Sequence, residues 1–379
     1  MRVSSLYIHI PFCASKCYYC DFNSYVSTPD VMDRYLDGLD RELELVAASY
    51  DHDPLQTVFF GGGTPTIFNT RQSERMVSLL HKHFRLADGA EVSSEANPGT
   101  VDLEKLQVLR DGGVNRLSFG VQSFDNDLLV KLGRLHDRDA VYRSWELARQ
   151  AGFGSINLDL MFGLPGQSVE TLETSINALL DLGPEHVSAY SLKVEEGTPF
   201  YTWHNRGQLI LPPEEDEVRM YQLVMDRLQG AGCEMYEISN FAKPGHRSRH
   251  NQVYWRNEPY MAAGSGAHGY VGSTRYINQK DVPLYIETTN GGQRPVTETE
   301  EISEQYQMED TMMLGLRLIE GVGYDRFRDK HGREMLDVFA GPIRKYEALG
   351  LLTVDEVGVR LTERGKFLAN EVFAAFLEG

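Results

Sequence analysis

Short apolar runs alternate with longer amphipathic stretches over the first 230 residues, and this alternation constrains the fold more than any other feature of the chain. Runs of β-branched and apolar residues bounded by turn residues indicate buried strands, whereas apolar residues spaced three and four apart indicate helices. Strict alternation of the two is typical of a parallel sheet covered by helices. Strands are predicted at residues 5–11, 57–61, 91–96, 116–121, 155–162 and 186–192, and helices at 31–49, 71–84, 103–110, 140–151, 169–182 and 214–228.

A polar or glycine-rich motif stands at the carboxyl end of each predicted strand. These motifs occupy residues 13–20, 61–65, 95–98, 120–123, 157–166 and 190–193. In βα barrels the functional site lies at this end of the strands. Six βα units are fewer than the eight of a closed barrel, so the predicted fold is α/β, a partial (β/α)6 TIM barrel with a site at its carboxyl rim.

Two acidic residues, Glu95 and Asp159, lie within predicted buried strands. A carboxylate is costly to bury unless a cation or a hydrogen-bond donor accompanies it. A charged ligand at the rim would supply such a partner. The triple glycine at 61–63 is expected to let the backbone approach a ligand closely, with Thr64 adding a hydroxyl.

Three cysteines, Cys13, Cys17 and Cys20, follow the first predicted strand with the spacing C-x3-C-x2-C. Three thiolates can hold three irons of a 4Fe-4S cluster and leave the fourth iron open for chemistry. A structural zinc site would need a fourth ligand, typically from a second pair. A disulfide is disfavoured in a chain with 4 cysteines and no secretory signal. The remaining cysteine, Cys233, is isolated and is expected to be a small buried hydrophobe.

Composition excludes some classes of function. The formal net charge of -18 argues against nonspecific binding of nucleic acid or anionic lipid. No apolar run approaches the roughly 18 residues of a membrane span. A cytoplasmic location is therefore expected.

The last third of the chain changes character. Helices are predicted at 306–319, 324–331, 342–349 and 363–377, with a hairpin near 350–362. Helices followed by a hairpin suggest a helical, winged-helix-like domain. We expect three parts: a barrel at 1–235, a connecting segment at 236–300 and a C-terminal helical domain at 301–379.

Several motifs together resemble the radical SAM superfamily. They are the cysteine motif with Tyr19, Y-I-H-I-P-F at 7–12, G-G-G-T-P at 61–65, G-V-Q-S-F at 120–124, L-G-R at 132–134 and D-L-M-F-G-L-P-G at 159–166. Over essentially the whole chain the resemblance is closest to the branch that contains the oxygen-independent coproporphyrinogen III oxidase HemN and the haem chaperone HemW.

The resemblance implies two cofactors, a 4Fe-4S cluster on Cys13, Cys17 and Cys20 and S-adenosylmethionine (SAM) bound to its open iron. SAM carries a carboxylate, an ammonium and a sulfonium, so a mixture of acidic, basic and backbone groups would complement it. The residues that match SAM-lining positions are Tyr7, Tyr19, Gly63, Thr64, Glu95, Gln122, Arg134, Asp159, Lys193 and His268.

Two departures separate the chain from the oxidase pattern. Asp21 and Phe22 follow Cys20 where the oxidase motif continues with x-C, and the first strand begins almost at the first residue, without the oxidase's amino-terminal extension. Both weigh against coproporphyrinogen decarboxylation. A SAM-dependent oxidoreductase nevertheless stays as the alternative, so enzymatic activity is left open.

The segment 250–255 matches the H-N-x-x-Y-W motif of the chaperone, with His250 as the candidate ligand of haem iron. Judged on residue types alone, His250 would be structural, and His246, His268 and Cys233 remain alternatives. The resemblance implies haem and a haem-acceptor protein as partners. The identity of the acceptor stays open, and it could be membrane-associated. The oligomeric state, monomer or homodimer, also stays open.

Overall fold

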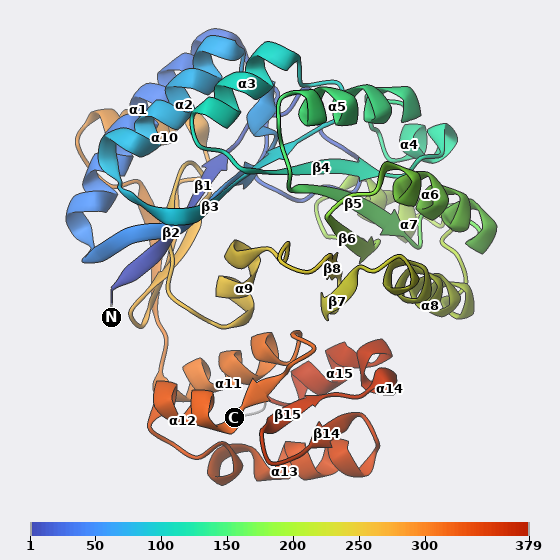
Figure 1. The fold of residues 1–379 in the computed structure, drawn as a ribbon. Helices are drawn as coiled ribbons and strands as arrows, with labels where there is room; N and C mark the ends of the chain where they lie inside the picture. Colours follow the sequence, from blue (N-terminus) through green and yellow to red (C-terminus); the bar gives the residue numbers. More distant parts are fainter. Residues whose placement is uncertain (1, 378–379) are drawn as a thin grey trace.

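Six parallel strands, β1 to β6, form the centre of the molecule in chain order (Figure 1). The computed structural model describes residues 2–377. Because each strand pairs with the next one along the chain, the sheet winds in one direction, as in a βα barrel. The predicted partial barrel is confirmed. The strands span Val3–Ile10, His52–Gly62, Leu86–Ala96, Arg116–Gln122, Ile156–Phe162 and His186–Ser191.

Further strands extend both ends of this sheet. β9 (Met261–Ala263) lies parallel to β1, while β8 (Asn240–Ala242) runs antiparallel to β6 and β7 (Glu234–Glu237) runs antiparallel to β8. β7 and β9 are the two end strands of the nine-stranded order. The barrel is thus open along one side.

Helices cover one face of the curved sheet (Figure 1). Side-chain caps set the starts of several of them: Asn69 forms a capping box with Gln72, and Asp102, Asp137 and Ser168 each accept a backbone N–H from the third residue of their helix. The helices of this half are α1 Pro29–Ser49, η1 Pro65–Ile67, α2 Thr70–His83, α3 Leu103–Asp111, α4 Asn126–Lys131, α5 Arg138–Gln150, α6 Val169–Leu182, α7 Pro199–Asn205 and α8 Glu214–Gly230.

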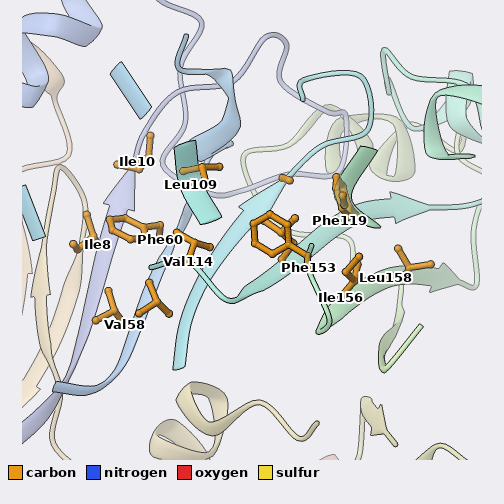
Figure 2. Close-up of a cluster of buried hydrophobic side chains, with 14 of the residues drawn as sticks. Ile8, Ile10, Val58, Phe60, Leu109, Val114, Phe119, Phe153, Ile156 and Leu158 are labelled. Atoms are coloured by element: carbon orange, nitrogen blue, oxygen red, sulfur yellow. The ribbon is translucent and has the colours of Figure 1, made fainter. Parts of the chain in front are cut away.

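The core lies between these helices and the sheet, as Figure 2 shows. Strand residues two apart point the same way, so Ile8 with Ile10 and Val58 with Phe60 enter this core and are fully buried. The residues between them, such as Tyr7 and Phe59, face the opposite side of the sheet. That side carries the candidate site.

The segment 236–300 is more than the connection that the sequence predicts. It supplies β8 and β9 to the main sheet and forms a second sheet of β10 (His268–Val271), β11 (Thr274–Asn278) and β12 (Val296–Glu301). Glu42 of α1 joins it to the barrel, because its buried carboxylate accepts hydrogen bonds from Gly264 N–H, Asn278 and Tyr285. Its helices are α9 Arg249–Trp255 and α10 Val282–Asn290.

The C-terminal part has its own apolar core, which includes Met312, Phe327, Ile343 and Val372. The predicted helices and hairpin are confirmed, although the final predicted helix divides at Leu368 and the third begins at Met335 rather than at 342. The elements are α11 Glu304–Gly315, β13 Val322–Gly323, α12 Tyr324–His331, α13 Met335–Ala348, β14 Leu352–Val354, β15 Gly358–Leu361, α14 Glu363–Phe367 and α15 Ala369–Ala374. Within residues 2–377, no helix has the length and apolar character needed to cross a bilayer.

Candidate functional site

The three cysteines of the loop after β1 line a cavity of about 490 Å³ at the carboxyl ends of the strands. We call it the cysteine cavity. Its volume is within the usual range of small-molecule sites. All three thiols are free, and burial raises the pKa of Cys13 and brings that of Cys20 to about 11. These thiols would lose their protons readily only to a bound metal.

The thiols of Cys13 and Cys17 contact different side chains of the cavity wall. Cys13 Sγ lies 3.4 Å from Thr64 Oγ1, and Arg134 Nη1 donates to Cys17 Sγ at 3.5 Å. Among residues 2–377, no group of three His, Cys, Asp or Glu side chains is placed to hold a single metal ion. A cluster that offers each thiolate a different iron suits this spacing better than one zinc ion.

The glycines at the end of β2, Gly62 and Gly63, hold the cysteine loop in place. Gly63 N–H donates to Ile10 O at 2.8 Å, and Thr64 N–H donates to Phe12 O at 2.7 Å. A Cβ at Gly63 would lie 2.5 Å from Phe12 O, and one at Gly62 would lie 2.3 Å from the His9 ring. The sequence suggested that these glycines make room for a ligand; in the structure, Gly62 and Gly63 line the cysteine cavity and also make room for the chain itself.

Strand alternation brings the polar side chains of different strands together. Gly120 of β4 pairs with Asp159 of β5, and Asp159 pairs with Ser188 of β6, so these residues lie in one row across the sheet. Eight of the ten residues predicted to contact SAM line the cysteine cavity: Tyr7, Tyr19, Gly63, Thr64, Glu95, Gln122, Arg134 and Asp159.

Two carboxyl groups face this cavity without an ion pair. Burial, with Asp159 as a second cause, raises the pKa of Glu95 to about 8, although Gly62 N–H donates to its Oε2 at 2.9 Å. Burial also raises the pKa of Asp159, against the hydrogen bonds from Asn157 and Ser188. A bound cation would stabilise both carboxylates, as inferred from the sequence.

Arg134 is fixed in a hydrogen-bond chain that crosses three strands. It donates to Gly120 O and, at 2.5 Å, to Asn97 Oδ1, and Asn97 Nδ2 donates to Thr64 Oγ1 at 2.7 Å. Thr64 in turn contacts Cys13. Asn97 is not among the residues predicted for the site, although its motif marked the carboxyl end of β3.

Sequence reasoning also missed Arg116, the first residue of β4. Its side chain lines the cysteine cavity, is 3% exposed, and leaves Nε without a hydrogen-bond partner in the described part of the chain. Burial raises the pKa of Asp159 and lowers that of His250; the charge of Arg116 opposes the first shift and adds to the second. A charged residue opening a buried strand was the signal that could have identified it.

The H-N-x-x-Y-W motif forms α9, which lies across the open side of the sheet (Figure 1). His250 is fully buried, and its two ring nitrogens lie 2.9 Å from Thr57 Oγ1 and 2.8 Å from the Tyr254 hydroxyl. Burial lowers its pKa to about 3. Since an iron ligand needs a free ring nitrogen, His250 could bind haem only after one of these contacts broke. Asn251 and Tyr254, by contrast, line the cysteine cavity.

Lys193 and His268, the other two predicted SAM contacts, do not line that cavity. The Lys193 side chain is 81% exposed and pairs with Glu195 at 2.6 Å. His268 begins β10 and is exposed. It lines two further cavities, which open beside the first.

These neighbours, the middle cavity of about 530 Å³ and the outer cavity of about 720 Å³, share walls with the cysteine cavity. The middle cavity shares Tyr7, Lys16, Phe22 and Tyr254 with it. Tyr254 also lines the outer cavity. The three cavities therefore adjoin one another, and one tyrosine of the α9 motif borders all of them.

A partial parallel barrel with three cysteines at its carboxyl rim defines a radical SAM protein, and comparison with known proteins agrees. The radical SAM superfamily model matches residues 7–179, and the HemN C-terminal domain model matches residues 302–368. Superfamily membership implies a 4Fe-4S cluster and SAM, and the free thiols and unpaired carboxyls of the cysteine cavity fit both.

Relatives that match over nearly their whole length identify the family within the radical SAM class. The chain is 46% identical over 376 residues to the haem chaperone HemW of Bacillus subtilis, covering 99% of each chain, and 34% identical to that of Escherichia coli, covering 98% of each. The structure of the E. coli coproporphyrinogen III oxidase HemN, a radical SAM enzyme, matches with a TM-score of 0.86 at 26% identity, covering 99% of this chain and 90% of that one. The chain belongs to the HemW family.

Proposed function

We propose that this protein is a haem chaperone, which binds haem and transfers it to an acceptor protein while carrying a 4Fe-4S cluster and SAM. The observation that carries the proposal is 46% identity over the whole chain to a relative named as a haem chaperone, against 26% to the oxidase. Phe22 adds to it. This side chain stands where the oxidase motif has a further cysteine, is 59% exposed and lines both the cysteine and the middle cavities.

Cys13, Cys17 and Cys20 would hold the cluster, and the walls beside them would hold SAM. A reduced cluster with SAM supplies one-electron chemistry. Glu95 and Asp159 would accept the ammonium group, and the donors of Arg134 and the Thr64 hydroxyl would orient the carboxylate. The hydrogen-bond chain through Asn97 keeps Arg134 in position before a ligand arrives.

The second candidate is a SAM-dependent oxidoreductase acting on coproporphyrinogen III or another substrate. Eight of the ten predicted SAM-lining residues share one cavity with the three cysteines, and this arrangement favours retained chemistry. The two functions differ in what they do to a porphyrin. A chaperone releases it unchanged, whereas the oxidase removes carboxyl groups from its precursor.

The test uses anaerobically reconstituted protein in two parallel assays, haem titration and coproporphyrinogen turnover with SAM and a reductant. We expect saturable binding of one haem per chain and little turnover. Cys17→Ser, which lacks a cluster ligand, controls for cluster-dependent signals. Turnover without saturable haem binding would overturn the chaperone proposal in favour of the oxidoreductase.

The proposed transfer of haem to an acceptor requires a second measurement. Haem-loaded protein would be mixed with a candidate apo-acceptor from the cytoplasm or the membrane, and movement of haem would be followed by separating the two proteins. Light scattering of the same sample would distinguish monomer from homodimer. Retention of all haem by this protein with every acceptor offered would contradict the carrier role.

A further inference from the structure

His268 stands at the border between the middle and outer cavities. It lines both, together with Tyr254 and Tyr260. The two tyrosine rings meet edge to face with centroids 4.7 Å apart. A histidine beside flat aromatic walls is the combination that a porphyrin with a central iron requires.

Histidines that line the three cavities can be compared directly. His9 is buried, and its ring nitrogens contact the Tyr7 hydroxyl at 2.9 Å and Asn23 O at 2.8 Å. His268 is exposed, and within residues 2–377 its ring makes no side-chain hydrogen bond or ion pair. His250 lines none of these cavities. His268 is thus the accessible imidazole of the two adjoining cavities that it lines.

Charge differs between the two cavities and gives a porphyrin a preferred direction. The middle cavity carries the ammonium groups of Lys16 and Lys280, with Asp21 as its acid. The outer cavity carries Glu258, Glu298 and Glu300, and its Arg275 is already paired with Asp310 at 2.6 Å. Propionates would be repelled from the outer cavity and attracted to the middle one.

The apolar edge of a porphyrin has the opposite preference. Aromatic and aliphatic side chains line the outer cavity, namely Tyr254, Trp255, Tyr260, Tyr270, Tyr276, Ile277 and Leu314. Burying apolar porphyrin surface there is favourable. The two cavities together match the two ends of a haem.

We propose that His268 is the axial ligand of the haem iron, with the propionates at Lys16 and Lys280 and the apolar edge in the outer cavity. This inference rests on the proposed chaperone function and names its cargo site. It moves the ligand from His250 of the H-N-x-x-Y-W motif to β10, and it leaves Tyr254 of that motif as a wall of the site.

The test titrates ferric haem into reconstituted protein and records absorbance and electron paramagnetic resonance. His268→Ala should raise the Kd for haem by roughly tenfold or more and remove the signature of nitrogen ligation, and added imidazole should restore that signature. His204→Ala is the matched control, because His204 is exposed on α7 and outside the three cavities.

A second pair of measurements tests the orientation. Lys280→Ala should weaken binding of haem but leave binding of the haem dimethyl ester, which lacks ionised propionates, unchanged. An equal loss for both ligands would overturn the propionate assignment.

The failures can be told apart. Saturable haem binding by wild type, with unchanged spectra for His268→Ala, would overturn the His268 assignment and leave the chaperone function standing. Absence of saturable binding by wild type would overturn the function, and this inference with it.

Discussion

Replacing Gly63 with alanine tests whether the glycines after β2 serve the cysteine loop or a ligand. The new Cβ would lie 2.5 Å from Phe12 O, 2.7 Å from Ile10 O and 2.8 Å from Phe12 N. All three atoms are backbone, so no side-chain rotation relieves the contact. The loop that carries the cysteines must move away from β2.

Two backbone hydrogen bonds and the added methyl group set the cost of this movement. Moving the loop stretches the hydrogen bonds from Gly63 N–H to Ile10 O and from Thr64 N–H to Phe12 O, now 2.8 and 2.7 Å. Each contributes about 1 kcal/mol, and overpacking adds about 1–3 kcal/mol. We therefore expect Gly63→Ala to lower the free energy of unfolding by roughly 3–5 kcal/mol and to displace the cysteines from their cluster geometry.

Urea unfolding of the cluster-free protein and the iron and sulfide content after reconstitution measure the two effects. Gly154→Ala is the control, because a Cβ there meets no atom within 4 Å and its φ is not positive. If Gly63 served only ligand approach, Gly63→Ala would match Gly154→Ala in stability and cluster content and lose SAM binding alone. That result would refute the loop-holding role.

Three further predictions concern buried polar groups. The folded-state pKa of Glu95 is about 8, against an ordinary 4.5, so burying this carboxyl costs little stability below pH 4.5 and progressively more as the pH rises through 8. In urea melts, Glu95→Gln should therefore gain stability relative to wild type by roughly 4 kcal/mol between pH 4 and pH 9. A difference that stays constant over this pH range would contradict the prediction. His250→Ala breaks the contacts with Thr57 and Tyr254 and leaves a void, so it should lower the free energy of unfolding by about 3 kcal/mol. His268 is exposed, so His268→Ala should lower it by less than about 0.5 kcal/mol. Equal losses of stability in thermal melting would count against the burial argument. Arg116→Met removes a buried charge without breaking a hydrogen bond, so stability should stay within about 1 kcal/mol or rise, and a loss above about 3 kcal/mol in urea unfolding would reveal an essential partner.

The six central strands could be predicted because most of them are buried apolar runs and each is followed by a distinct motif. The predicted strand at 116–121 differs from β4 by one residue, and the helix predicted at 169–182 matches α6 fully. β9, in contrast, has three residues, and its place beside β1 depends on pairing with residues some 250 positions earlier. Local periodicity carries no information about such a partner.

The site residues could likewise be predicted where they belong to a motif that follows a strand. Motif residues at strand ends, such as Thr64 and Gln122, reach the cavity because parallel strands bring their carboxyl ends together. Arg116 lies at the start of its strand and reaches the same cavity through strand alternation, which a motif search does not capture. The surroundings of His250 were less predictable, because one of its ring contacts comes from Thr57, far away in the sequence, and only the other comes from Tyr254 of the same motif.

In the haem site proposed above, Tyr254 gives the H-N-x-x-Y-W motif a role as a wall of the site, while His268 supplies the ligand. Two backbone N–H groups at the start of α9 donate to Glu91 of β3, and the His250 ring stacks on Phe59 and contacts Thr57 of β2. These contacts fix the helix, and the hydrogen bond between His250 Nε2 and the Tyr254 hydroxyl then fixes that hydroxyl. Because Tyr254 borders the cysteine cavity and both neighbouring cavities, a ligand that moves its ring in one cavity changes the shape of the others. SAM and haem would then alter each other's affinity by the same factor, as linkage requires, with the motif as the shared wall through which they do so.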